Sequence, residues 1–87
     1  MIYVDDYCGT YRNMKMSHLL STISLEELHD FAVNQLGLKR NWFQDGSAPH
    51  YDVSESKRTL AIQLGAIAIH APSKEWLAVY RKAKEIT

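Results

Sequence analysis

The sequence predicts a small α/β domain in which a short mixed sheet is packed by about three helices, with an irregular α+β packing as the alternative. Short runs of β-branched and aromatic residues alternate with amphipathic stretches along the chain. Two of these stretches follow sequences typical of helix starts. The 87 residues, 46% hydrophobic and 23% charged, suit a single domain over residues 1–87 with one core.

The first half of the chain is expected to contribute two strands and a helix. Residues 2–4 form a β-branched and aromatic run that Asp5 and Asp6 end, which indicates a buried strand. A second strand is expected over residues 14–20, and its alternation places four side chains on one face: Met14, Met16, His18 and Leu20. A capping box over residues 24–27 then begins a helix that the spacing of apolar residues carries to Gly37.

The second half is expected to contribute a short extended piece, two helices and a strand. Residues 42–44 are extended, and a loop rich in helix and strand breakers follows over residues 45–50. Asp52 begins the next helix, which Gly65 ends. Residues 66–70 read as a short buried strand, and an amphipathic helix over about 73–85 shows Trp76, Leu77, Tyr80 and Ala83 as its apolar face.

Composition excludes several classes of function. Ten basic and ten acidic residues give a net charge of zero, so nonspecific binding to nucleic acid is not expected. No apolar run reaches membrane-spanning length, and we expect no membrane partner. The single cysteine, Cys8, permits neither an intrachain disulfide nor a cysteine-rich zinc site. The lack of a disulfide fits a protein of the reducing cytoplasm. Cys8 also has no neighbouring histidine in the sequence that would activate it as a nucleophile. A chain of this size would gain stability from a homo-oligomer or a bound ligand.

Seven short pieces of the chain carry a family resemblance. In order they are Ile2-Tyr3-Val4-Asp5-Asp6, Ser17-His18-Leu19, Glu27-Leu28-His29, Trp42-Phe43-Gln44, His50-Tyr51-Asp52-Val53, Lys57-Arg58 and Leu64-Gly65-Ala66. The ordered set, from Ile2 to about Ile69, is similar to the short bacterial and phage proteins catalogued as domain of unknown function 4031 (DUF4031). That family name assigns no activity. The occurrence of the family in phages implies an accessory or host-interaction role in the host cytoplasm. The expected last helix lies outside the set of seven pieces.

The densest group of polar residues surrounds the expected start of the second helix. If Asp52 caps this helix, its free N–H groups lie beside His50 and Tyr51, with Lys57 and Arg58 close behind. Such a group suits a phosphate or carboxylate. Trp42 and Gln44 just before the loop extend the expected ligand site, with Trp42 and Phe43 as an aromatic wall. The alternative is that Asp52 only caps while the two cations are solvated or pair with Glu55.

A second candidate site is acidic. Asp5 and Asp6 at a strand end, with His18 on the neighbouring strand, have the donor atoms to hold Mg²⁺, Mn²⁺ or Zn²⁺. Adjacent strand residues point to opposite faces, so the alternative is a turn in which one acid accepts backbone N–H bonds. His29 lies on the apolar face of its helix, where a histidine usually hydrogen-bonds to the backbone or to a carboxylate. His70 ends a strand and is a weaker candidate.

Three functions are compatible with the sequence. The first is a binding module for a phosphorylated metabolite or nucleotide. The second is a metal-dependent phosphoester hydrolase or nuclease, in which Asp5, Asp6 or Asp52 holds a divalent metal and His18 or His50 moves protons. The third is a protein-binding inhibitor of a host protein that uses the basic last helix. The residues do not decide whether the protein is an enzyme or which cofactor it uses.

Overall fold

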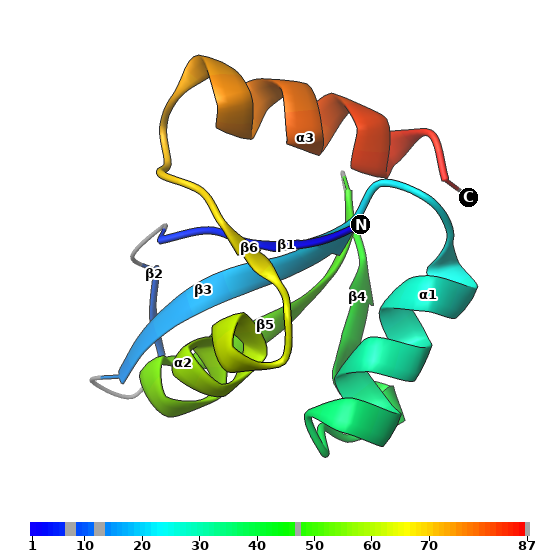
Figure 1. Ribbon diagram of the computed structural model, residues 1–87, viewed down its shortest axis with the longest axis vertical. Coiled ribbons are helices and arrows are strands. Elements are labelled where there is room, and N and C mark those ends of the chain that lie inside the picture. The colour runs from blue at the N-terminus through cyan, green and yellow to red at the C-terminus, as the bar shows by residue number, and fades with distance from the viewer. Residues whose placement is uncertain (7–8, 12–13, 47, 87) are drawn as a thin grey trace.

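One mixed sheet organises the computed structural model, which describes residues 1–6, 9–11, 14–46 and 48–86 (Figure 1). The strand order is β4 (Phe43–Asp45), β5 (Pro49–Ser54), β3 (Met14–Ser21), β1 (Ile2–Val4) and β6 (Ile67–Ala68), and β2 (Gly9–Tyr11) pairs with β3 off this path. The β1–β6 pair is parallel, and the other pairs are antiparallel. This arrangement confirms the predicted small domain with a mixed sheet.

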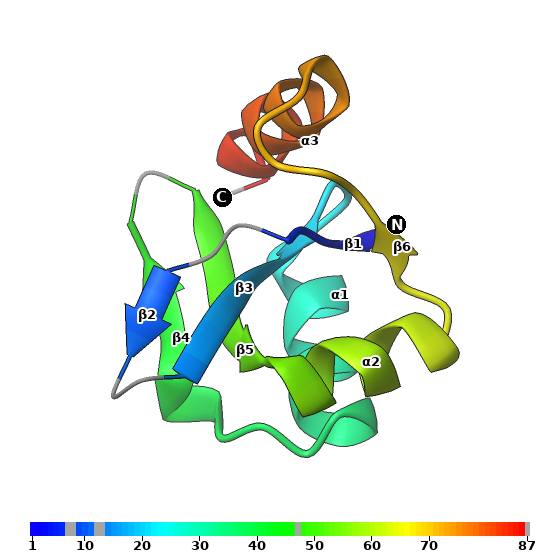
Figure 2. The ribbon, with the colours of Figure 1, turned by 90° about the vertical axis from the view of Figure 1, so that its left-hand side faces the viewer.

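Strands β1 and β2 pair one after the other with the same edge of β3 (Figure 2). In this register Val4 lies opposite Leu19 and Gly9 lies opposite Met16. Asp5 follows β1 directly, and its backbone N–H donates to the carbonyl of His18 at 3.1 Å. The structure therefore confirms the second strand, and it places Asp5 beside His18. Cys8 lies outside the described residues.

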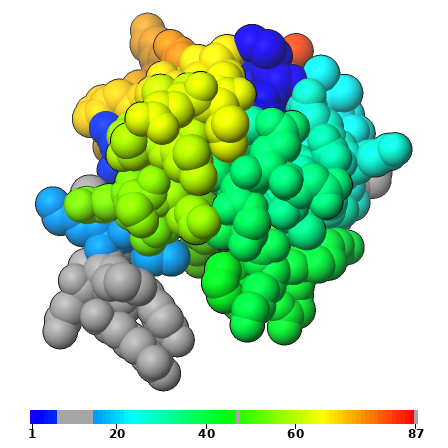
Figure 3. Space-filling model, turned by 60° about the horizontal axis from the view of Figure 1, so that its bottom comes forward, coloured from blue at the N-terminus to red at the C-terminus, as the bar shows by residue number. Residues whose placement is uncertain are grey.

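Helices cover both faces of the sheet (Figure 1). On one face lie α1 (Leu25–His29), its continuation as a π-helix, η1 (Asp30–Gln35), and α2 (Glu55–Gln63). They pack against strand residues that include Val4, Leu19 and Val53. Figure 3 shows α1–η1 and α2 side by side on this face, where Lys57 Nζ of α2 donates to the carbonyl of Leu36 just after η1.

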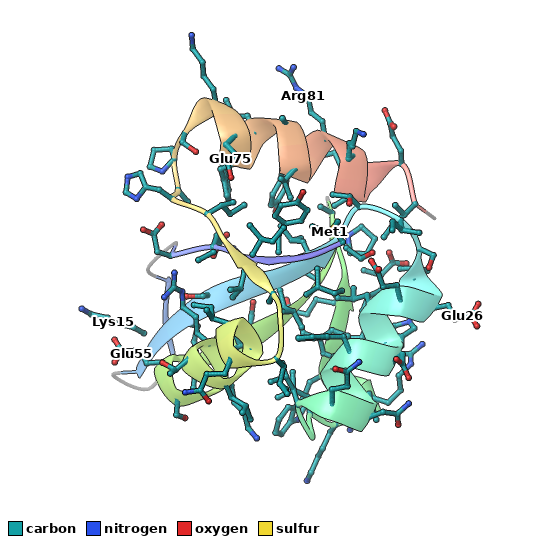
Figure 4. The ribbon with its side chains drawn as sticks, viewed as in Figure 1. Met1, Lys15, Glu26, Glu55, Glu75 and Arg81 are labelled. Carbon is teal, nitrogen blue, oxygen red and sulfur yellow. The ribbon has the colours of Figure 1, made fainter. Side chains whose placement is uncertain are left out.

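The opposite face carries α3 (Lys74–Lys84) over a smaller core that includes Leu20 and Ile69. Ser73 begins this helix by accepting a hydrogen bond from the N–H of Trp76 at 3.0 Å, and Ser24 begins α1 in the same way. Arg81 points away from the sheet (Figure 4). Both helix starts confirm the sequence prediction, but the side chain of Leu77 is 47% exposed, and Val79 is buried in its place.

The prediction that Asp52 begins the second helix is wrong. His50, Tyr51 and Asp52 belong to β5, and Ser54 is the residue that caps α2, with its oxygen 3.4 Å from the N–H of Lys57. The predicted irregular loop is correspondingly short, because β4 and β5 form a hairpin across it. Residues 50–54 alternate between the two sheet faces, and pairing with β3 and β4 satisfies backbone groups that a loop would leave unpaired.

Within the described part of the chain, no helix is long and apolar enough to cross a membrane.

Candidate metal centre

The candidate site lies on the same sheet face as α3, next to the part of β3 on which α3 packs. His18 in β3 lies directly opposite Asp52 in β5, and His50 lies opposite Gln44 in β4. Because His50 and Asp52 are two residues apart in one strand, their side chains leave the same face. Leu20 leaves that face two residues beyond His18 and packs in the core beneath α3. The site therefore lies beside the α3 core, on paired strands of the sheet.

Two imidazoles and one carboxylate converge at this place. His50 Nε2 lies 3.4 Å and His18 Nε2 lies 3.9 Å from the same oxygen, Asp52 Oδ1. One ligand atom of each residue lies within 4.8 Å of the other two. Ligand atoms on a single transition-metal ion stand about 3 to 3.5 Å apart, because each bond is about 2.1 Å long. Small side-chain movements would bring all three residues onto one ion.

Each histidine is held through its other ring nitrogen. Nδ1 of His50 donates to the carbonyl of Ala48 at 2.7 Å, and Nδ1 of His18 donates to Asp5 Oδ2 at 2.9 Å. A carbonyl can only accept a hydrogen bond, so the proton of a neutral His50 ring is on Nδ1 and the lone pair is on Nε2. Bonds of this kind fix the orientation of metal-binding histidines. Both rings are thus arranged as ligands whose Nε2 atoms lie near Asp52.

The carboxylate that holds His18 is fully buried. Asp5 Oδ1 accepts the backbone N–H of His18 at 2.8 Å, and Oδ2 also accepts the indole N–H of Trp76 from α3 at 2.9 Å. The carbonyl of Asp5 accepts from Arg58 Nε at 2.8 Å. Burial raises the pKa of Asp5, but the hydrogen bonds from His18 and Trp76 outweigh it, so the pKa lies below its ordinary value. The hydrogen bond to Asp5 in turn raises the pKa of His18.

Asp5 and Asp6, which the sequence suggested as metal ligands, lie outside the cluster. Of the three residues predicted, His18 belongs to the cluster, and Asp5 contacts His18 from behind. Asp6 lies beside His70, whose Nδ1 donates to Asp6 Oδ2 at 2.7 Å. Asp6 Oδ1 accepts the backbone N–H of Ala71 at 2.6 Å. The Ala71 bond is the main reason that the pKa of Asp6 is lowered. These contacts tie the segment after β1 to the segment after β6.

The residues expected to bind an anion are only partly together. Tyr51 points to the opposite face, where it is fully buried and its hydroxyl shares a 2.8 Å hydrogen bond with His29 Nδ1. His29 therefore has a hydrogen-bond partner, but this partner is a phenol hydroxyl and not the backbone group or carboxylate that was expected. The ammonium of Lys57 donates to a backbone carbonyl, that of Leu36, at 2.8 Å, and Arg58 donates to that of Asp5. Both cations thus have a structural role, and their binding of a phosphate stays a prediction.

A groove of about 670 Å³ shares one residue, Asp52, with the site. Asp52 and Gln44 belong to its lining, and the Gln44 amide donates to Asp52 Oδ2 at 2.6 Å. Trp42 and Phe43 line it as well, with Lys57 on its wall. The predicted aromatic wall is therefore part of this groove.

Sequence reasoning missed the joint role of His50 and Asp52 as candidate ligands. The available signal was the spacing of these two residues, which places both side chains on one face if the segment is a strand. Treating Asp52 as a helix cap hid this relationship.

The fold and the site define a small mixed-sheet domain with a candidate centre of two histidines and one aspartate. Residues 2–83 match the family described as Protein of unknown function (DUF4031), and the chain belongs to this family. The match extends through most of α3, beyond the motif set that ended near residue 69. No curated protein matches the chain, and no solved structure matches it either.

Proposed function

We propose that the protein is a divalent-metal-dependent phosphoester hydrolase whose metal ion is held by His18, His50 and Asp52. The observation that carries this proposal is the convergence of two imidazole nitrogens and one carboxylate oxygen on a sheet face. The Nδ1 atoms of both histidines donate hydrogen bonds to oxygen acceptors. This arrangement presents the donor atoms that a metal ion requires and fixes them before the ion arrives.

The donor set indicates the class of metal. Imidazole nitrogens suit Zn²⁺, Fe²⁺ and Mn²⁺, whereas Mg²⁺ and Ca²⁺ prefer sites made of oxygen alone. Three protein ligands also leave at least one position on the ion for water or substrate, as in catalytic rather than structural sites. Asp52 also lines the groove, in which the rest of a substrate would lie.

A bound ion would supply Lewis acidity and lower the pKa of a water molecule. The chain contributes the positions: the Gln44 amide holds Asp52 Oδ2, while Asp52 Oδ1 faces the two histidines. Lys57 on the groove wall adds positive charge that favours an anionic substrate. In the reaction, the oxygen of water joins phosphorus, the bond from phosphorus to the alcohol oxygen breaks, and that oxygen takes up a proton.

Two other hypotheses share parts of this proposal. A binding module for a phosphorylated metabolite would use the same metal ion or cations without turnover. A protein-binding inhibitor would keep its partner after the metal ligands are removed. A bacterial or phage origin, a cytoplasmic place and a homo-oligomer stay predictions.

Metal content and hydrolysis test the proposal together. We expect the purified protein to take up about one Zn²⁺ or Mn²⁺ per chain by calorimetry, and His50→Ala to lose this binding. His70→Ala is the matched control, because His70 also pairs with a carboxylate but lies outside the cluster. Hydrolysis of p-nitrophenyl phosphate, a phosphomonoester, should require the metal and stop with a chelator. Metal uptake that is unaffected by His50→Ala, or turnover in the absence of metal, would contradict the proposal.

A further inference from the structure

We propose that the groove beside the metal centre holds the nucleobase of a mononucleotide against Trp42, with the phosphate directed to the metal ion. This inference rests on the proposed function and deepens it, because it names the class of substrate.

The groove and the metal centre share a residue. Asp52 directs Oδ1 to the two histidines and also lines the groove. Gln44, another lining residue, donates a hydrogen bond to the other carboxylate oxygen of Asp52, Oδ2. A phosphate on the ion would therefore leave its organic group in the groove. The groove volume of about 670 Å³ lies within the range of about 300 to 1,000 Å³ that small-molecule sites occupy.

Trp42 provides a surface on which a planar ring can stack. It lies in the short helix η2 (Arg40–Trp42), and 49% of the residue is exposed although it lines the groove. The Lys39 ammonium lies 5.8 Å from the centre of the Trp42 ring. Phe43, which also lines the groove, packs against the rings of His29 and Tyr51 and therefore forms an apolar wall. An exposed indole in a concave site is the feature that base stacking uses.

The polar lining fits the rest of a nucleotide. Asn41 and Gln44 carry amides, which can donate to and accept from the edge of a base. Lys57 is the cation of the lining, and Asp52 is its carboxylate, which the metal ion would neutralise. With the ion bound, the lining is positive at the end where the phosphate would lie. An uncharged aromatic ligand would not use this charge, so the groove favours a phosphorylated one.

The test compares two phosphates that differ only in the base. Calorimetry of the Zn²⁺-loaded protein should show adenosine 5′-monophosphate binding at least about tenfold more tightly than ribose 5-phosphate, because only the former can stack. Trp42→Ala should abolish this advantage, and Trp42→Phe should keep most of it. Leu77→Ala is the control, since it removes an exposed apolar side chain of α3.

The outcomes separate this inference from the proposed function. Equal affinities for the two phosphates, or an advantage that survives Trp42→Ala, would overturn the groove assignment and leave the metal centre intact. If no metal binds, adenosine is titrated against the metal-free protein: binding that Trp42→Ala removes supports the base site, and no binding overturns it. A single-stranded oligonucleotide that binds more tightly than the mononucleotide would also overturn the assignment to a mononucleotide.

Discussion

The carboxylate of Asp5 contacts His18 twice, once through the backbone N–H at 2.8 Å and once through the ring Nδ1 at 2.9 Å. The first contact replaces a sheet hydrogen bond at the point where β1 ends, and the second sets the direction of the imidazole. The buried carboxylate thereby links the fold to a proposed metal ligand. Since Trp76 donates to the same carboxylate, the docking of α3 is part of this link.

Asp5→Asn should weaken metal binding without removing a ligand. The amide cannot offer acceptors to the backbone N–H, to Nδ1 and to the indole as the carboxylate does, and the loss of charge makes Nε2 of His18 less basic. We expect metal affinity to fall by about 10- to 100-fold, measured by calorimetry. Asp6→Asn is the control, and an Asp5→Asn variant with wild-type affinity would show that Asp5 does not position His18.

Trp76→Phe should loosen the attachment of α3. The substitution keeps an aromatic ring in the core but removes the N–H that donates to Asp5 at 2.9 Å. We expect the free energy of unfolding to fall by about 1 to 2 kcal/mol in urea denaturation, because the lost bond is to a charged group. Tyr80→Phe, which alters a neighbouring ring of the same helix, serves as the control. Equal stability of Trp76→Phe and the wild type would contradict the proposed link.

The Asp5–His18 pair should make the stability of the metal-free protein depend on pH. The pKa of His18 is raised above 6.5, so its contribution is complete below about pH 6.5 and is lost as the pH rises through the folded-state value. The pKa of Asp5 is lowered below 3.8, so its contribution is present above about pH 3.8 and is lost at lower pH. Urea unfolding of the wild type and His18→Gln should show a difference that is largest between these limits. A difference that grows above pH 7 would contradict this assignment.

Metal affinity should increase with pH, whereas the stability that the Asp5–His18 pair contributes decreases as the pH rises. The ion needs the unprotonated Nε2 of His18, whose pKa is raised by the bond to Asp5. We therefore expect Zn²⁺ affinity to decrease as the pH falls below the raised pKa, beginning at a higher pH than for a histidine with an ordinary value. Calorimetry between pH 6 and 8 measures this slope. An affinity that is constant over this range would exclude His18 as a ligand.

Tyr51→Phe should affect stability but leave the metal centre unchanged. The Tyr51 hydroxyl is bonded to His29 on the sheet face opposite His50 and Asp52. Its removal should lower the free energy of unfolding by about 0.5 to 1.5 kcal/mol. Metal affinity, measured by calorimetry in parallel, should equal that of the wild type. A large loss of metal binding would show that Tyr51 contributes to the metal centre as well as to the core.

Local signals in the sequence were enough to predict part of this structure. Ser24 begins a helix as the capping box indicated, and the last helix begins after Pro72 as expected, because such capping bonds involve residues close in sequence. Strand β5 was missed because the sequence around Asp52 also resembles a helix start. Its pairing with β3 and β4, which no local pattern encodes, decided the outcome.

The same distinction applies to the candidate site. The sequence brought Asp5 and His18 together on neighbouring strands, and the structure places them in contact. Burial decides which of these two residues is accessible to a metal ion. Asp5 is fully buried behind His18, so His18 is the candidate ligand. The meeting of His18 with Asp52 depends on the register of β3 against β5. Register results from packing across the whole sheet, so the sequence alone did not reveal it.

The most direct test of the metal centre is a crystal structure of the protein grown with Zn²⁺, with anomalous scattering recorded at the zinc edge. We expect one peak about 2.0 to 2.2 Å from His18 Nε2, His50 Nε2 and an oxygen of Asp52. A peak at Asp6 and His70 instead, or no peak among these three ligands at saturating Zn²⁺, would contradict the proposed centre.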